Sequence, residues 1–93
     1  MVVGIVRIEL HLPASRSLKD KRQVLRSLKD RIRERAQASV AEVEHQDLWQ
    51  RAALGVAVVA TDGGQARERL QVVRGLVEQA FEAQITDWQE SFE

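Results

Sequence analysis

The spacing of the apolar residues changes repeatedly along this 93-residue chain, and the order of these spacings restricts the folds that it can adopt. Residues 2–12 alternate, with apolar side chains on one parity and charged or polar side chains on the other. The apolar set is Val2, Val6, Ile8, Leu10 and Leu12, and the other set is Arg7, Glu9 and His11. Such alternation is typical of a strand with one buried face, so we expect a half-buried strand at the start of the chain.

A helix is predicted to follow, from Leu18 to about Gln37. Its apolar residues fall at helical spacing, at positions 18, 25, 28, 32 and 36. Ser17 suits the N-cap position, and Asp20 stands three residues later as an acidic form of the capping box.

Two strands are predicted in the middle of the chain. Residues 39–45 alternate loosely and indicate a short strand. Residues 53–61 are apolar on both parities, which is typical of a strand buried in the middle of a sheet.

A second helix and a last strand are predicted for the remainder. Asp62 suits an N-cap, with Gln65 three residues later, and the helix is expected to end near Glu82. Its apolar stripe comprises Ala66, Leu70, Val73, Val77, Ala80 and Phe81. Residues 83–93 are expected to form a final edge strand.

The predicted order is strand, helix, strand, strand, helix, strand. This order is that of the ferredoxin-like split βαβ plan, an α+β fold. We therefore expect a single domain over residues 1–93, with a four-stranded antiparallel sheet that carries both helices on one face. The other face would be open to solvent or to a partner.

Composition excludes several kinds of chemistry. The chain has no cysteine, which excludes disulfides, thiolate metal sites and thiol catalysis, and which fits a reducing cytoplasm. No apolar run is long enough to cross a membrane, and residues 1–12 resemble a strand more than a signal peptide. We therefore expect a cytoplasmic protein without a membrane partner.

Positive charge gathers on the first helix although the chain has no net charge. Residues 16–35 hold nine basic and three acidic side chains, whereas the remaining residues hold five basic and eleven acidic ones. At about 100° per residue, five of the basic side chains share one flank of the helix and form a basic stripe on the order of 20 Å long. The basic stripe consists of Lys19, Arg22, Arg26, Lys29 and Arg33.

Two interpretations of this charge remain open. In the first, the helix tracks the phosphates of RNA, and the contacts are Lys19, Lys21, Arg22, Arg26, Lys29 and Arg33. In the second, the basic side chains are solvated or face acidic groups on a protein. The four aromatic residues, Trp49, Phe81, Trp88 and Phe92, lie in a connector, a helix and the tail. RNA would therefore bind by backbone charge and not by base stacking on the sheet.

The strand at residues 53–61 has a second face of small apolar residues. If its even-numbered side chains pack under the helices, its odd-numbered ones face outward together with Ile5. The outward set of Ile5, Gly55, Ala57 and Val59 suits packing against a second sheet, so a homodimer interface is expected there. The alternative is a partly exposed central strand in a monomer.

Catalytic and metal-binding signals are weak. His11 and His45 have no metal-ligand spacing, and His11 is expected on the strand surface. Glu42 and Glu44 could act as an acid and base pair, but on one strand face they more often meet solvent or a basic neighbour. Trp49 is expected to cover one end of the core. We predict no catalytic residues, no metal and no cofactor.

Two blocks of sequence, SLKDKR at 17–22 and SVAEVEHQDLWQRAALGVAVV at 39–59, resemble the YlxP-like family of bacterial proteins. The family pattern falls on Ser17, Leu18, Lys19, Lys21 and Arg22, then on Ser39, Val40, Ala41, Glu42, Val43, Asp47, Trp49 and Gln50. The resemblance implies a ferredoxin-like fold. It also implies genes beside those for transcription and translation factors, including ribosome-binding factor A, and it supplies no catalytic residues.

The leading hypothesis is a non-enzymatic accessory factor of RNA or of the small ribosomal subunit. A second hypothesis is a homodimeric protein-interaction module whose basic helix meets an acidic protein surface. A third is an enzyme or small-molecule binder that uses a cleft near Glu42, His45 and Asp47.

Overall fold

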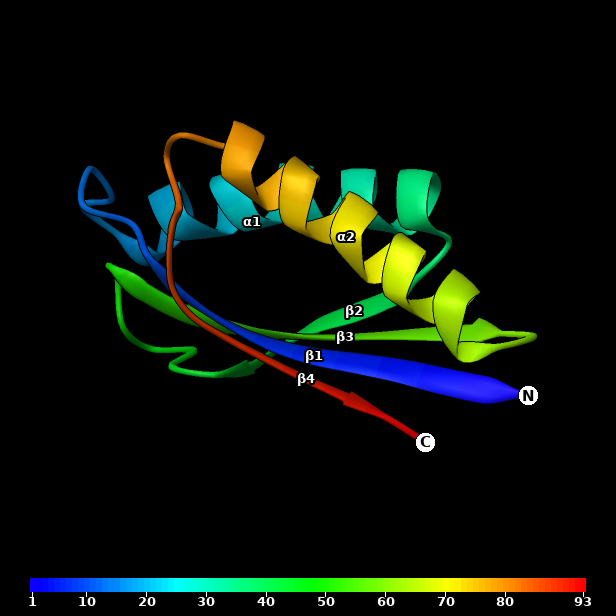
Figure 1. Cartoon of the computed structure of the whole chain (residues 1–93). Helices are drawn as coiled ribbons and strands as arrows, with labels where there is room; N and C mark the ends of the chain where they lie inside the picture. The colour runs from blue at the N-terminus through cyan, green and yellow to red at the C-terminus, as the bar shows by residue number, and fades with distance from the viewer.

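Two helices lie on one face of a four-stranded sheet in the computed structural model, which describes all of residues 1–93 (Figure 1). The elements are β1 (Val2–His11), α1 (Leu18–Ala36), β2 (Ser39–Glu44), β3 (Arg51–Ala60), α2 (Gly63–Gln79) and β4 (Gln84–Phe92). The strands pair antiparallel in the order β2-β3-β1-β4. The ferredoxin-like order, the central place of β3 and the edge position of β4 are therefore confirmed.

The core lies between the sheet and the helices. β1 and β3 pair residue by residue from Val2 opposite Ala60 to His11 opposite Arg51, so even-numbered residues of both strands share the inner face. These residues pack under helix residues that include Leu25, Leu28, Ile32, Leu70 and Val73, all buried. The odd-numbered residues line the face without helices, which we call the open face.

Each helix begins at the predicted cap. Ser17 Oγ accepts from the backbone N–H of Asp20 at 3.0 Å, and Asp20 Oδ2 accepts from the N–H of Arg16 at 3.0 Å. Asp62 Oδ1 accepts from the N–H of Gln65 at 2.9 Å. The contacts to Ser17 and Asp62 satisfy amide groups that the first helical turn leaves without partners, and the contact to Asp20 binds the amide of a residue before the cap.

The second helix ends earlier than the sequence predicted. It stops at Gln79 because the backbone of Ala80 leaves helical geometry and turns the chain toward β4, and Ala83 donates to the carbonyl of Ala80 at 2.9 Å. Ala80 and Ala83 remain buried, but the side chain of Phe81 is 86% exposed, so its predicted place in the apolar stripe is wrong.

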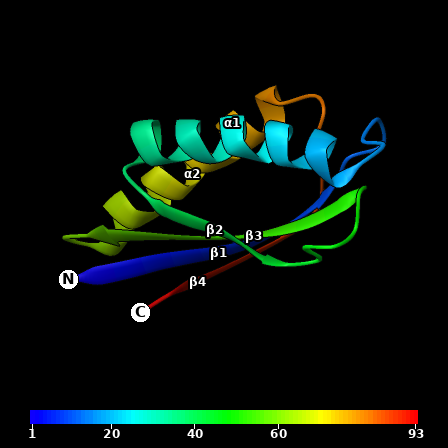
Figure 2. The same ribbon diagram turned by 180° about the vertical axis from the view of Figure 1, so that it is seen from behind.

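The helices are placed differently relative to the strands. Figures 1 and 2, which view the molecule from opposite sides, place α1 above the β2 side of the sheet and α2 above the β1 and β4 side. Neither helix has the length and apolar character that spanning a membrane requires.

Candidate nucleic-acid interface

The basic stripe lies on the flank of α1 above the edge strand β2. Arg33 Nη2 donates to the carbonyl of Val40 in β2 at 3.3 Å, which fixes the direction of this flank. Lys19, Arg22 and Arg26 are exposed, and Lys29 is half-buried. Arg33 also pairs with Asp30 at 3.3 Å. Lys19, Arg22 and Arg26 have no such partner and are therefore the stripe residues most available to an external anion.

Basic residues outside residues 16–35 all have partners inside the protein. Arg7 pairs with Glu9 and Glu44, and Arg51 pairs with Glu9. The remaining three lie along α2. Arg67 stacks on Phe92, Arg69 donates to three backbone carbonyls, and Arg74 pairs with Glu78 and stacks on Trp88.

Basic side chains without any internal partner are therefore confined to residues 16–35. Within residues 16–35, only Lys21 and Arg33 have a carboxylate within ion-pair distance. The seven others are Arg16, Lys19, Arg22, Arg26, Lys29, Arg31 and Arg35. Sequence reasoning found the concentration of positive charge on residues 16–35. It did not find that the other basic residues all have partners, because most of these partners lie far away in the sequence.

Lys21 is wrong as a phosphate contact because it is fully buried, with 0% of the residue exposed. Its Nζ donates to the carbonyls of His45 at 2.8 Å, Gln46 at 3.3 Å and Arg51 at 3.2 Å. The Glu42 Oε2 atom lies 2.8 Å from the same nitrogen. The three ammonium hydrogens of Lys21 are directed to these carbonyls, so the attraction between Lys21 and the Glu42 carboxylate is one of opposite charges and not a hydrogen bond.

A signal for this buried pair was present in the sequence. Lys21 precedes the buried Leu25 by four residues and Leu28 by seven, which places it in phase with the apolar face of α1. Glu42 follows the buried Val40 by two residues in β2 and shares its inner face. A lysine and a glutamate that both lie in phase with apolar residues indicate a buried ion pair.

Glu42, His45 and Asp47 do not converge on one cleft, although Asp47 lines a hollow beside His11 and Arg51. A bulge between Glu42 and Glu44 sets Glu42 opposite Leu54 and Glu44 opposite Ala53, so the two carboxylates face opposite sides of the sheet and form no acid and base pair. His45 has a positive φ of 64° and lies beside Glu9, on the open face. No group of three carboxylate or histidine side chains is arranged to hold a metal ion.

The open face carries a charged cluster around Glu9. The carboxylate of Glu9 accepts from Arg51 Nη2 at 3.1 Å, lies 3.2 Å from Nε2 of His45 and pairs with Arg7 at 2.6 Å. Burial lowers the pKa of Arg7, but Glu9 and Glu44 outweigh it and raise the pKa. Burial raises the pKa of Glu9, but hydrogen bonds from Arg51 and His45 and the charge of Arg7 outweigh it and hold the pKa below its ordinary value of 4.5.

The lowered pKa of Glu9 makes its contribution to stability depend on pH. That contribution should be complete above the pKa of the unfolded chain, near 4.5, and should be lost as the pH falls through the lower pKa of the folded protein. We expect the Glu9→Gln variant to unfold at lower urea concentration than the native chain at pH 7, and the difference to shrink below pH 4.5. Urea titrations across this range, with the exposed Glu68→Gln of α2 as control, test the expectation, and a difference independent of pH would contradict it.

A hollow of about 610 Å³ lies beside the charged cluster. The hollow is lined by His11, Asp47, Leu48, Trp49, Gln50 and Arg51. Trp49 is 55% exposed there, so its predicted role as a cover for the core is wrong. The physical reason is that the buried Leu12 fills that end of the core, while residues 45–50 pass on the side of the sheet away from the helices (Figure 1).

The residues predicted for a dimer interface lie on the open face. Ile5, Gly55 and Ala57 are half-buried, and Val59 is 58% exposed. Val43 joins them, since a side chain added at Gly55 would meet Val43 Cγ1 at 2.9 Å. Sequence reasoning missed Val43 because it did not predict the bulge in β2.

Comparisons with known proteins agree with this fold and identify a family. A de novo designed protein with a ferredoxin fold, solved by solution NMR, is similar with a TM-score of 0.59 at 11% identity, over 100% of this chain and 84% of the designed one. "Uncharacterized protein YlxP" of Bacillus subtilis (strain 168) is 31% identical over 77 residues, which are 83% of this chain and 84% of the relative. The family model described as "Protein of unknown function (DUF503)" matches residues 3–90. The chain therefore belongs to the DUF503 family, to which the YlxP-like resemblance pointed.

Proposed function

We propose that the protein is a non-enzymatic cytoplasmic accessory factor that binds RNA, free or in the small ribosomal subunit, through the basic stripe of α1. One observation carries the proposal. Every basic side chain without an internal partner belongs to residues 16–35. The YlxP-like resemblance supports a ribosomal setting, because it implies genes beside those for translation factors.

The energetic cost of the basic stripe supports an external anion. Like charges three or four residues apart on a helix destabilise it by about 0.2–0.5 kcal/mol per pair. Lys19 also lies in the first turn of α1, where the helix dipole disfavours a cation. A row of phosphates removes both costs, and since no bases need be read, such binding should tolerate many sequences and weaken with salt.

Co-sedimentation with small ribosomal subunits, together with fluorescence anisotropy on labelled single-stranded RNA, tests this function at low and moderate salt. We expect the native chain to bind both targets, more weakly as salt rises. If the native chain binds neither target at low salt, the proposal is refuted.

A homodimer is the second candidate, and the apolar part of the open face favours it. Val59 and Val43 project outward near Ile5 and Ala57, and no helix covers them. A second copy of this chain presents the same apolar patch, so a two-fold contact between open faces would bury both patches. The dimer does not use the basic stripe and is compatible with RNA binding.

A charge placed on this patch should break the dimer. We expect the native 10.5 kDa chain to elute at about twice its mass at micromolar concentration, and Val59→Arg to elute as a monomer. Light scattering after gel filtration measures both masses. Val72→Arg, which places the same charge at an exposed position of α2, is the control and should remain dimeric. A native chain that is monomeric throughout would exclude this candidate.

A further inference from the structure

The hollow at the end of the sheet has an exposed tryptophan in its wall. Of the two tryptophans, Trp88 lies under Arg74 and donates to Glu90 at 2.7 Å, whereas Trp49 is 55% exposed and has no hydrogen-bond partner. The hollow of about 610 Å³ is shallow and open to solvent, so it suits a ligand that lies flat on the surface more than one that is enclosed. The exposed face of the Trp49 ring in the wall of this hollow is suited to stacking with another planar group.

The segment that carries Trp49 is held at several points. Lys21 Nζ donates to the carbonyls of residues 45, 46 and 51 from the helix side of the sheet. The side chain of Gln50 donates to the carbonyls of Pro13 at 3.3 Å and Ser15 at 3.1 Å, and its backbone carbonyl accepts from Leu12 at 2.9 Å. The segment is therefore fixed before any ligand arrives, which reduces the entropy lost on binding.

Polar groups around the ring have both donor and acceptor character. Asp47 offers a carboxylate that forms no hydrogen bond within the protein. Arg51 and His11 offer N–H groups, although Arg51 also pairs with Glu9 and Nδ1 of His11 lies 3.2 Å from the carbonyl of Gln50. A flat ligand with donors and acceptors on its edge and a negative charge nearby matches this set. An unpaired nucleobase with its phosphate has these properties.

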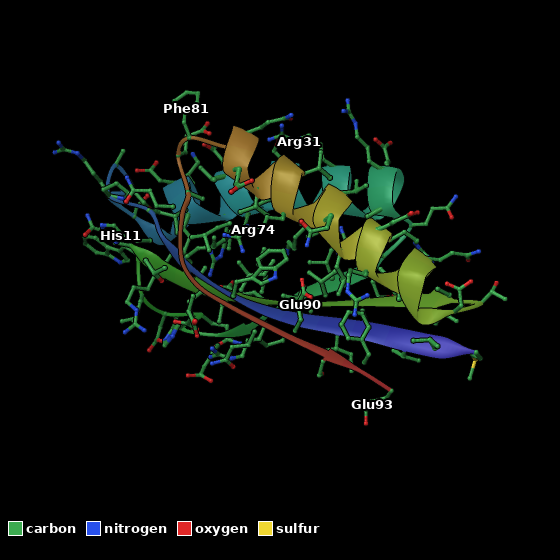
Figure 3. The ribbon with its side chains drawn as sticks, in the orientation of Figure 1. His11, Arg31, Arg74, Phe81, Glu90 and Glu93 are labelled. Atoms are coloured by element: carbon green, nitrogen blue, oxygen red, sulfur yellow. The ribbon has the colours of Figure 1, made fainter.

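The hollow lies at the same end of the molecule as the start of the basic stripe. Hydrogen bonds from the Lys21 side chain to three carbonyls connect the first turn of α1 to residues 45–51. Figures 1 and 2 both place this connection, the β1–α1 connection and the start of α1 at one end of the molecule. In Figure 3, His11 marks this end. A strand of RNA that follows Arg26, Arg22 and Lys19 would therefore reach the hollow.

We infer that the hollow binds an unpaired base of single-stranded RNA, stacked on Trp49, at the end of the phosphate track along α1. This inference rests on the proposed function, and it adds a stacking site to a surface that would otherwise recognise charge alone. It places stacking on the β2–β3 connection and not on the sheet.

Fluorescence anisotropy with a labelled oligouridylate of about twelve nucleotides tests the inference on the full chain. We expect Trp49→Ala to bind at least about fivefold and up to about a hundredfold more weakly, because stacking of one base on an aromatic ring has that effect. The dependence of affinity on salt should stay unchanged, since no phosphate contact is lost. Trp49→Phe should retain most of the affinity because it retains an aromatic face.

A control and a second measurement keep the test independent of folding defects. Phe81→Ala removes an even more exposed ring from the helix side of the molecule (Figure 3) and should bind like the native chain. Trp88→Phe leaves Trp49 as the only tryptophan, and its fluorescence should be quenched when the oligouridylate binds. Circular dichroism verifies that each variant is folded.

The outcomes separate this inference from the proposed function. If Trp49→Ala binds like the native chain, or Trp49 fluorescence does not change on binding, the stacking site is refuted while RNA binding by the stripe stands. If Trp49→Ala loses only co-sedimentation with ribosomal subunits and keeps its affinity for the oligouridylate, the hollow contacts a protein and the inference is overturned. If the native chain binds no RNA, both proposals fail.

Discussion

Replacement of Lys21 by methionine is expected to lower the free energy of unfolding by about 3–5 kcal/mol, the usual cost of removing one partner from a buried ion pair. The variant leaves the carboxylate of Glu42 without its counter-ion and leaves three backbone carbonyls without a donor. Domains of this size are stable by only about 5–15 kcal/mol, so the loss is a large fraction of the total. Urea denaturation followed by circular dichroism measures it.

A double variant separates the effect of the charge from the effect of the missing contacts. Lys21→Met combined with Glu42→Leu removes the unpaired carboxylate, so it should be more stable than Lys21→Met alone. Lys19→Met, two residues away on the exposed flank of α1, is the matched control and should change stability by less than about 0.5 kcal/mol. A cost below about 1 kcal/mol for Lys21→Met, or a double variant less stable than the single one, would contradict the structural role of the pair.

Removal of three exposed charges from the basic stripe is expected to weaken RNA binding about a hundredfold at 0.1 M salt. The variant combines Lys19→Gln, Arg22→Gln and Arg26→Gln, the stripe residues that are exposed and have no partner. Each phosphate contact on a single strand contributes about 0.7 to the slope of log affinity against log salt, so the slope should fall by about 2. Arg33 is left in place because it already forms an ion pair with Asp30 and donates a hydrogen bond to the carbonyl of Val40.

The control for this experiment has the same net charge with a different distribution. Gln71→Glu, Gln79→Glu and Gln84→Glu change exposed residues of α2 and β4 and also lower the net charge by three. This control should keep nearly the full salt slope and most of the affinity. Equal losses in the two triple variants would indicate that RNA responds to net charge and not to the stripe.

Much of the fold could be predicted because it depends on local spacing. Alternation in residues 2–12, helical spacing after Ser17 and the apolar run at 53–61 each indicate one element, and two N-caps fix where the helices begin. The end of α2 was missed because it depends on the distance that the chain must cover to reach β4. The apolar residue Phe81 continued the helical spacing, although the chain had already turned at Ala80.

The candidate site was harder to predict because burial changes the role of a charged residue. Lys21 and Lys19 are both lysines in the first turn of one helix, yet one is buried against Glu42 and the other is exposed. The direction of each side chain follows from helical phase, which the sequence does contain. The bulge in β2 does not follow from any local signal, and it decides on which sides Glu42, Val43 and Glu44 lie.

The strand order has a consequence for how the chain folds as it is synthesised. β1 is made first, but its two neighbours are β3 and β4, which span residues 51–60 and 84–92. The backbone hydrogen bonds of β1 to these strands therefore cannot form until those segments have been synthesised. Long-range pairing of this kind slows folding. During translation the apolar residues of β1 stay without partners until β3 leaves the ribosome, and a chaperone that binds extended apolar segments would meet this strand before any other part of the sheet.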